Sequence, residues 1–538
     1  MITGQSEDTI CAISTPSGVG GIAVVRVSGP DATAIVDKMW KGRRLSEVDT
    51  HTAHLGTITG DDGEVLDQCV ATVFRGPRSF TGEDVVELSV HGSVWIQRQT
   101  VNRLIQCGCR LATPGEFTRR AFASGRMDLA EAEGVADLIA SSSRASHRLA
   151  VSQMRGHFSS RLHELRERLL ELSSLLELEL DFSEEEVEFA PRGQLTELAR
   201  NIYDLTSRLA DSFATGSAIK NGVPVAIVGA TNAGKSTILN QLLHDDRAIV
   251  SDIHGTTRDT IEDTIEIGGV LFRLIDTAGL RNTSDTIESL GIERALSELD
   301  KAEVVVWVVD CSDMARNAEV WSKIRGHLTP SHRMIVARNK VDLIKGGSSA
   351  EGSATSGDES RAEGSFGQGS GAGAVAGPIE RSGPVGVSNL IGGAGKAEQV
   401  SGLIGESEGS EDNAFEAIVC GQDGGADLDG GYRPFRVVDL VAREGKGIEE
   451  LSNAMVDASG IAQVQEGDVM VTNARHYEAL TNASQAMSRV LDSLAAGISG
   501  DFIAQDIRLA LHHLGEITGE ITTHDILANI FSRFCIGK

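Results

Sequence analysis

One short glycine-rich segment constrains the fold of this 538-residue chain more than any other feature. Residues 229–237 read GATNAGKST, which matches the pattern GxxxxGK[ST], and they directly follow the apolar run at 223–228. A strand, a glycine loop and a helix in this order form a phosphate-binding loop, in which backbone N–H groups surround a β-phosphate. Lys235 would then reach the β- and γ-phosphates, and the hydroxyl of Ser236 would ligate Mg²⁺. The alternative is a chance glycine turn, which the further nucleotide motifs disfavour because they follow in the expected order.

Those further motifs predict that the nucleotide is GTP. The sequence DTAG at 276–279 follows the apolar run at 271–275, so its aspartate can hold the Mg²⁺ shell and its glycine N–H can sense the γ-phosphate. The sequence NKVD at 339–342 follows another run, and the carboxylate of Asp342 can accept two hydrogen bonds from guanine, whereas adenine lacks that donor pair. Thr256 and Thr257 lie between these motifs, where a switch threonine completes the Mg²⁺ shell only with GTP bound. The residues assigned to GTP on this basis are Asn232, Ala233, Gly234, Lys235, Ser236, Thr237, Thr256, Thr257, Asp276, Thr277, Ala278, Gly279, Asn339, Lys340 and Asp342.

Two departures from common GTPases bear on hydrolysis. Leu280 follows the DTAG motif, so the usual water-orienting glutamine is absent, and Glu288 is the nearest downstream carboxylate. From spacing alone, Glu288 is equally well a solvated glutamate at a helix start. Asn232 lies inside the phosphate loop, where its amide could ligate a monovalent cation in place of an arginine, or could simply suit a tight turn.

Composition limits the class of protein. The chain is too long for one hydrophobic core, so we expect three or four domains. Its net charge of −28 excludes RNA binding by bulk electrostatics and leaves only local contacts or contacts shared with a basic partner. No apolar run approaches the roughly 18 residues of a membrane span, and the first residues lack the features of a secretion signal. The seven scattered cysteines favour a reducing, cytoplasmic environment, and the CGC sequence at 107–109 is expected to be two half-buried thiols rather than a metal site.

The pattern along the chain predicts a multidomain protein with α/β and all-α parts. Short β-rich runs at 22–27, 70–74 and 85–90 indicate an N-terminal α/β domain over 1–120. An apolar stripe of leucines at 162, 165, 169, 172 and 176 indicates helices over 121–215, and similar stripes return at 480–494 and 503–514. We therefore expect 121–215 and 461–538 to form one discontinuous helical domain, into which a Ras-like P-loop domain at 216–460 is inserted. Within that domain, the Gly/Ser/Glu-rich segment 346–431 is expected to be a disordered insert.

The chain also resembles a known family, the tRNA-modification GTPase MnmE (also called TrmE). The resemblance runs essentially end to end apart from 346–431. It is carried by segments far more specific than the nucleotide motifs, namely residues 8–30, PRSFTGEDVVEL at 77–88, PGEFTRRAF at 114–122, MDLAEAE at 127–133 and FSRFCIGK at 531–538.

The resemblance implies a cytoplasmic homodimer joined through its N-terminal domains, each of which binds 5-formyl- or 5,10-methylene-tetrahydrofolate. It implies that the chain works on tRNA with the flavoprotein MnmG (GidA), in an α2β2 assembly that adds a carboxymethylaminomethyl or aminomethyl group at C5 of the wobble uridine. It makes the GTPase potassium-dependent and Glu288 its water-orienting residue, and it favours a functional thiol at Cys535. The residues implied for K⁺ are Asn232, Ser251, Ile253 and Thr256, and those for Mg²⁺ are Ser236 and Thr257. The loop Ser251, Asp252, Ile253, His254, Gly255 and Thr256 also belongs to the GTP site, and the folate positions are Arg26, Glu87, Arg126 and Lys538.

Two positions depart from the family pattern. Arg126 stands where a lysine is expected, which keeps the charge and changes the geometry. Val441 and Ala442 stand where a Ser-Ala pair is expected at the last guanine-contacting loop, so a backbone contact remains and a hydroxyl contact is lost. The competing hypothesis is a regulatory, ribosome-assembly-type GTPase without modification chemistry. Such proteins carry a GXXG-bearing RNA-binding module after the switch domain, which the helical C-terminal stretch lacks.

Overall fold

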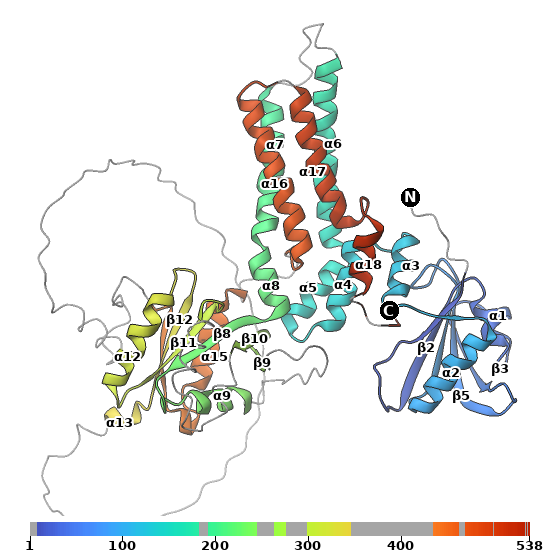
Figure 1. The fold of residues 1–538 in the computed structure, drawn as a ribbon, viewed down its shortest axis with the longest axis horizontal. Coiled ribbons are helices and arrows are strands. Elements are labelled where there is room, and N and C mark those ends of the chain that lie inside the picture. Colours follow the sequence, from blue (N-terminus) through green and yellow to red (C-terminus); the bar gives the residue numbers. More distant parts are fainter. Residues whose placement is uncertain are drawn as a thin grey trace, which may run out of the picture.

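The computed structural model describes residues 8–181, 192–244, 263–275, 299–345, 434–461, 469–498, 500–532, 534 and 536–537. It places a helical bundle between two domains built on β-sheets (Figure 1). The described chain begins in one sheet domain, runs into the bundle, enters the second sheet domain and returns to the bundle. Within this described part, no helix is long and apolar enough to span a bilayer.

The N-terminal domain is a seven-stranded sheet in the order β3-β4-β5-β6-β2-β1-β7. Its strands are β1 (Ile10–Ile13), β2 (Ile22–Ser28), β3 (Trp40–Lys41), β4 (Thr52–Thr59), β5 (Val65–Phe74), β6 (Val85–His91) and β7 (Arg110–Leu111). All neighbouring pairs are antiparallel except β1 and β7. Buried side chains alternate with others along β5, which is the period-2 pattern of a sheet with one face on a core. This confirms the three β-rich runs predicted from the sequence.

Two helices cover the core of this sheet, α1 (Ala32–Asp37) and α2 (Val94–Cys107). Cys107 and Cys109, expected to be half-buried, are more deeply placed, with 8% and 6% of their surface exposed. The reason is that Gly108 ends α2 with a φ of 123°, which turns the chain back so that both thiols join the core beneath the helix.

Three short helices lead from this domain into the bundle: α3 (Glu116–Ala123), α4 (Leu129–Ala140) and α5 (Arg144–Met154). The predicted domain boundary at 120/121 falls inside α3. Helix α4 begins with a capping box, in which the Asp128 side chain accepts from the Glu131 N–H and the Glu131 side chain accepts from the Asp128 N–H.

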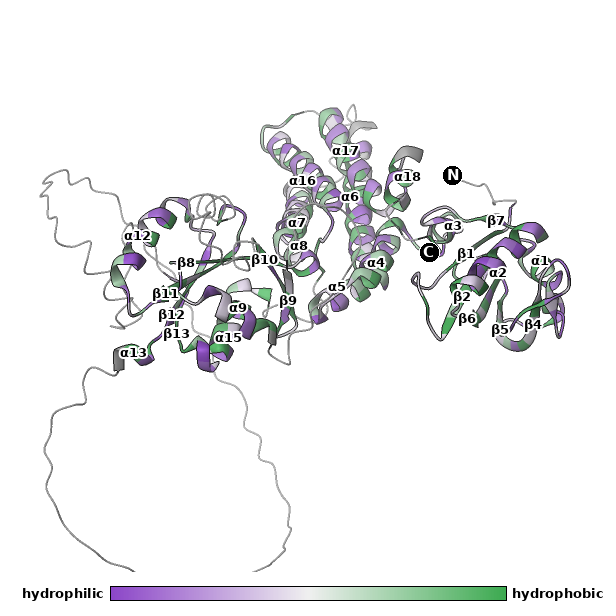
Figure 2. Cartoon of the chain, turned by 60° about the horizontal axis from the view of Figure 1, so that its bottom comes forward, coloured by the Kyte–Doolittle hydropathy of each residue, from purple (hydrophilic) through white to green (hydrophobic). Residues whose placement is uncertain are grey.

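The bundle consists of α6 (His157–Asp181), α7 (Arg192–Asp211), α16 (Ala474–Ala495) and α17 (Gly500–Thr518), followed by α18 (His524–Ser532). The leucines of the predicted stripe on α6 are all buried in one core with residues of α16 and α17. Figure 2 shows α6, α16 and α17 side by side. Ser207 and Ser484, 277 residues apart in the chain, share a hydrogen bond of 2.7 Å between their hydroxyls. The discontinuous helical domain predicted from the sequence is therefore confirmed.

The inserted domain is a six-stranded sheet in the order β13-β12-β11-β8-β10-β9. Its strands are β8 (Val223–Gly229), β9 (Asp263–Ile267), β10 (Val270–Ile275), β11 (Val304–Asp310), β12 (Arg333–Asn339) and β13 (Arg436–Leu440), and its helices are α8 (Phe213–Asn221), α9 (Lys235–His244), α12 (Met314–Ile324), α13 (Asp342–Lys345) and α15 (Ile448–Ser459). Only β9 is antiparallel to its neighbour. Helices α9 and α15 supply the core on one face and α12 on the other, so β11 is buried along its whole length.

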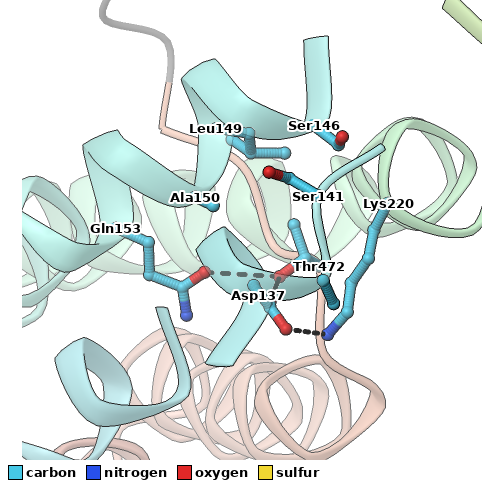
Figure 3. A pocket seen from close by; sticks show the side chains of 9 residues that line it. Asp137, Ser141, Ser146, Leu149, Ala150, Gln153, Lys220 and Thr472 are labelled. Carbon is cyan, nitrogen blue, oxygen red and sulfur yellow. Dashed lines mark hydrogen bonds and ion pairs between the residues drawn. The ribbon is translucent and has the colours of Figure 1, made fainter. Parts of the chain in front are cut away.

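The bundle holds the inserted domain at the end of the sheet away from the phosphate loop. Helix α8 runs straight into β8, and Lys220 near its end pairs with Asp137 of α4 at 2.8 Å (Figure 3). Thr472 donates to Asp137 at 3.5 Å and to Gln153 at 3.4 Å beside the same small pocket. The Ala145 N–H, at the start of α5, donates to the Gly269 carbonyl in the β9–β10 turn at 3.1 Å. The contact with the bundle therefore fixes the near ends of β8 and β10 and leaves the far end of the sheet open.

Candidate functional site

The glycine-rich loop joins the carboxyl end of β8 to the first turn of α9, as the sequence predicts. Its backbone conformation requires glycine at 234, where φ is 105° and a Cβ atom would lie 2.2 Å from the Asn339 amide nitrogen. Asn232 adopts a left-handed φ of 65°, which asparagine tolerates better than most residues. Asn232 and Thr237 are exposed, whereas Ala233 is fully buried. The loop therefore presents its backbone and polar side chains to solvent while one residue anchors it in the core.

Lys235 folds back onto the loop that precedes it. Its ammonium donates to the Gly229 carbonyl at 2.7 Å and to the Ala230 carbonyl at 2.8 Å. Burial lowers the pKa of Lys235, because charging an amine out of water is costly. Ser236, half-buried, follows directly in the first turn of α9. A bound phosphate would offset the desolvation of the ammonium, so this position suits an anionic ligand better than an empty loop.

Asn339 ties two loops together at the end of β12. Its side-chain amide donates to the Ala233 carbonyl in the glycine-rich loop at 2.8 Å, and its carbonyl oxygen accepts from the Ala442 N–H at 3.0 Å. Asn339 is 4% exposed, so both hydrogen bonds are shielded from water. The loop at 441–442 is therefore tied to the glycine-rich loop through Asn339, and the backbone contact with guanine predicted for this loop stays a prediction.

Lys340 and Asp342 follow this bridge. Lys340 has a φ of 64°, and its ammonium lies 2.6 Å from a carboxylate oxygen of Asp310 at the end of β11. Asp342 opens α13 and is exposed. Since β8, β11, β12 and β13 are parallel, their carboxyl ends meet at one edge of the sheet, which is where open α/β sheets bind ligands. The structure thus brings the described members of the predicted GTP site together.

Several predicted positions lie outside the described residues. They are Ser251, Asp252, Ile253, His254, Gly255, Thr256, Thr257, Asp276, Thr277, Ala278, Gly279, Glu288, Cys535 and Lys538, together with the insert 346–431. The strand that follows the positions 251–257, β9, and the strand that precedes the positions 276–279, β10, are both described, and β10 pairs in parallel with β8. The carboxyl end of β10, at Ile275, therefore lies at the same edge of the sheet as the carboxyl end of β8, where the glycine-rich loop begins.

The N-terminal domain holds a second group of predicted residues. Arg26 on β2 lies opposite Glu87 on β6, and its guanidinium donates to one carboxylate oxygen of Glu87 from two nitrogens, each at 2.9 Å. The rings of Phe80 and Phe117 lie 5.3 and 5.6 Å from the guanidinium carbon. The side chains of Arg26 and Glu87 are 19% and 27% exposed, so a ligand can reach both. Arg126 is exposed and follows α3.

The C-terminal tail docks on this same domain. The Ser14 hydroxyl donates to the Gly537 carbonyl at 3.1 Å, and a Cβ atom on Gly537 would lie 2.2 Å from the Ile13 carbonyl. Ala12, the residue before Ile13, pairs with Arg26 across β1 and β2. Gly537 therefore contacts β1 at the residue next to Ala12, the strand partner of Arg26.

Comparisons with known proteins agree with this arrangement. A family model described as the GTP-binding protein TrmE N-terminus matches residues 9–126, and one described as the MnmE helical domain matches residues 129–535. Curated proteins named tRNA modification GTPase MnmE are 45% identical, over 98% of this chain and 100% of the relative from Parabacteroides distasonis, and over 99% and 100% for one from Bacteroides fragilis. The chain belongs to the MnmE family. Among solved structures, the G domain of the T. maritima FeoB iron transporter is 17% identical and covers 44% of this chain and 98% of that chain, but its TM-score of 0.23 is too low to support an argument.

The structure of this MnmE-family chain also shows a charge network that the sequence reasoning missed. Arg120, 6% exposed, contacts carboxylates of Asp8, Glu83 and Glu116 at 2.8 to 3.1 Å. Burial alone would raise the pKa of Glu116, but hydrogen bonds from Arg110, Thr113 and Arg120 outweigh it and lower the pKa to about 2. Part of the signal was present, because Glu83 lies in the segment PRSFTGED, and Glu116 and Arg120 lie in the segment PGEFTRR. The sequence does not show that these charged side chains pair with one another and thereby hold both segments beside Arg26.

Proposed function

We propose that this chain is the GTP-hydrolysing component of an enzyme that modifies the wobble uridine of tRNA. The observation that carries the proposal is its 45% identity over 536 residues to a curated tRNA modification GTPase, an alignment that covers 98% of this chain and 100% of that relative. The convergence of the glycine-rich loop, Asn339 and Ala442 on one sheet edge supports a nucleotide site. A regulatory, ribosome-assembly-type GTPase is the alternative. It is disfavoured because the domains on both sides of the inserted sheet also match the modification family.

Each part of the nucleotide site has a role in this proposal. The loop backbone and Lys235 hold the phosphates, Ser236 and Thr257 ligate Mg²⁺, and Asp342 selects guanine. Mg²⁺ and K⁺ supply positive charge that stabilises the charge developing on the phosphates. The positions assigned to K⁺ are Asn232, Ser251, Ile253 and Thr256. Asn232 is exposed and has a left-handed φ within the phosphate loop, which supports this assignment, and Glu288 orients the attacking water.

The folate proposal concerns the N-terminal domain. A tetrahydrofolate, in its 5-formyl or 5,10-methylene form, would supply one carbon and bind at Arg26, Glu87, Arg126 and Lys538. The fit is supported by the Arg26–Glu87 pair, because Arg26 engages one carboxylate oxygen and the described residues make no bond to the other. A partly exposed carboxylate that pairs with a guanidinium through one oxygen is a suitable acceptor for the N–H donors of a pterin edge. The docking of Gly537 beside Ile13 supports the inclusion of Lys538 and Cys535 at this site.

The modification step also needs partners. We infer that the chain acts as a homodimer joined through its N-terminal domains and that it works with the flavoprotein MnmG, in an α2β2 assembly that adds a carboxymethylaminomethyl or aminomethyl group at C5. A net charge of −28 makes independent tRNA binding unfavourable, so a partner that shares the tRNA contact is consistent with the charge of this chain.

The test is mass spectrometry of wobble uridines in tRNA from a deletion strain. Wild-type chain should restore the modification, whereas Lys235→Ala should not because phosphate binding is lost. Glu87→Gln should also fail to restore it while the purified variant still hydrolyses GTP. The matched control is Glu47→Gln, which changes a carboxylate of the same domain that is 66% exposed and should behave as wild type. If wild-type chain hydrolyses GTP and leaves uridine unmodified in the cell, the regulatory alternative gains support.

A further inference from the structure

The contact between Lys340 and Asp310 is not explained by the nucleotide motifs. Asp310 is the last residue of β11, and it pairs with Asn339, the last residue of β12, in the parallel register of the two strands. Figure 1 shows these two strands side by side in the inserted sheet. The Lys340 ammonium reaches back across this register to an Asp310 carboxylate oxygen at 2.6 Å. The ion pair therefore connects the ends of two strands at the edge of the sheet where the predicted GTP site forms.

Asp310 is held more firmly than a surface carboxylate. Its other carboxylate oxygen accepts from the N–H of Ser312 at 3.0 Å and from the Ser312 hydroxyl at 2.6 Å. Its own backbone N–H and C=O are both bonded to the Asn317 side chain, at 3.2 and 2.7 Å. Only 7% of Asp310 is exposed. Because these partners fix the position of the Asp310 carboxylate, the ion pair restrains the Lys340 side chain rather than the carboxylate.

Lys340 needs such a support because its backbone is in an unfavourable conformation. A left-handed φ costs a residue other than glycine on the order of 1–3 kcal/mol, which surrounding contacts have to offset. The Leu343 N–H donates to the Lys340 carbonyl at 3.0 Å, so the turn at Lys340 also starts the segment that carries Asp342. The Asp342 side chain is exposed and makes no hydrogen bond to another of the described residues. The direction in which Asp342 leaves the sheet is therefore set by the turn at Lys340.

We propose that Asp310 is a positioning residue for guanine recognition, which fixes Lys340 and thereby the turn that orients Asp342. This inference rests on the proposed function of Asp342 as the residue that reads guanine. Asp310 itself touches no nucleotide in this proposal. It acts through Lys340, and its loss should change which base is preferred and should leave the hydrolysis step as it was.

The test compares GDP with IDP, because inosine lacks the exocyclic amino group that Asp342 would recognise. The variant Asp310→Asn keeps an oxygen for Ser312 and places an amide against the lysine ammonium. We expect its GDP affinity to fall by roughly 10-fold, and its preference for GDP over IDP to fall by roughly threefold or more, as for a lost charged hydrogen bond. The kcat for saturating GTP should be unchanged, because only ground-state recognition is altered.

Two further variants separate positioning from general destabilisation. Asp313→Asn is the matched control, because Asp313 caps α12 three residues along the chain and does not contact Lys340. Lys340→Met removes the ammonium at nearly constant volume, and a double variant with Asp310→Asn should lose no more base preference than either alone. This variant also serves if Asp310→Asn does not fold.

The outcomes are distinguishable from failure of the proposed function. If the wild-type protein binds GDP and IDP equally, the guanine site itself is wrong. If the wild type prefers GDP and Asp310→Asn loses affinity for both nucleotides in equal proportion, the site stands and the positioning role is refuted. Additive losses in the double variant also count against Asp310 acting through Lys340.

Discussion

Replacing Asn339 by alanine tests whether one buried amide holds the nucleotide loops in place. The side chain satisfies two main-chain groups, the carbonyl of Ala233 and the N–H of Ala442. Ala233 is 0% exposed and Ala442 is 1% exposed, so water does not readily replace the lost partner. A buried polar group without a partner costs about 1–3 kcal/mol, so the two together cost about 2–6 kcal/mol.

This cost should appear partly as a lower free energy of unfolding and partly as weaker nucleotide binding. The reason is that both loops need the same geometry in the free protein and in its nucleotide complex. We expect the affinity for GDP to fall at least about 10-fold, which corresponds to about 1.4 kcal/mol. The rest should appear as a lower midpoint of thermal unfolding. The assay is a fluorescence titration with a labelled GDP at low temperature, where the variant remains folded by circular dichroism.

Two comparisons make the reasoning refutable. Asn339→Asp keeps an acceptor for the Ala442 N–H and loses the donor to Ala233, so it should disturb the phosphate loop selectively. His332→Ala is the matched control at the other end of β12, where the ring accepts from the Thr329 N–H at 2.8 Å and contacts the Leu299 carbonyl at 3.1 Å. That control should lower stability without changing GDP affinity. An Asn339→Ala protein that is folded and binds GDP within about twofold of wild type would show that the bridge does not shape the site.

Three further predictions follow from other parts of the structure. Gly234→Ala places a Cβ atom 2.2 Å from the Asn339 amide nitrogen at a φ of 105°, so GDP affinity measured by the same titration should fall by about 10-fold or more. Gly326→Ala, whose Cβ atom would have no neighbouring atom within 4 Å, should leave GDP affinity unchanged. Burial alone would raise the pKa of Glu133, but the nearby His476 and Arg475 outweigh it and lower the pKa from 4.5 to about 2. This carboxylate therefore contributes about 3 kcal/mol to the free energy of unfolding, which is fully present above about pH 4.5 and lost as pH falls toward 2. Acid titration followed by circular dichroism should show this pH dependence, and Glu133→Gln should flatten it. GTP turnover should be faster in KCl than in NaCl at equal ionic strength, by roughly 10³-fold if K⁺ acts as an arginine finger does. Asn232→Ala should abolish this difference, and equal rates for the wild-type protein contradict the potassium proposal.

The sequence predicted those features that depend on period and order. The leucine stripe beginning at Leu162 specified a buried helix face because side chains three and four residues apart share one side of a helix. The position of Lys235 after an apolar run specified a strand, a loop and a helix. Both statements concern residues near one another in the chain, where local geometry decides the outcome.

The features that escaped prediction depend on pairs of residues distant in sequence. Arg26 and Glu87 were both assigned to a ligand, and the register of β2 and β6 places them opposite each other, where they pair. Asp310 lies 30 residues before Lys340 and carries no motif of its own, so nothing in the sequence marks it as that lysine's partner. A single sequence specifies which charges exist, whereas sheet register specifies which of them meet.

The split helical domain has a consequence for the order in which the protein is made. Helices α6 and α7 leave the ribosome long before α16 and α17, so the parts of their apolar faces that pack on α16 and α17 stay uncovered until then. At about 5–20 residues per second, the 277 residues between Ser207 and Ser484 take roughly 14–55 s to synthesise, which is ample time for the inserted sheet domain to fold first. During that interval the nascent chain exposes a leucine stripe that holdase chaperones bind, and the bundle closes only when translation is nearly complete. A ribosome that stalls within the inserted domain therefore leaves a nascent chain in which a complete N-terminal domain is followed by a helix pair whose apolar face stays exposed.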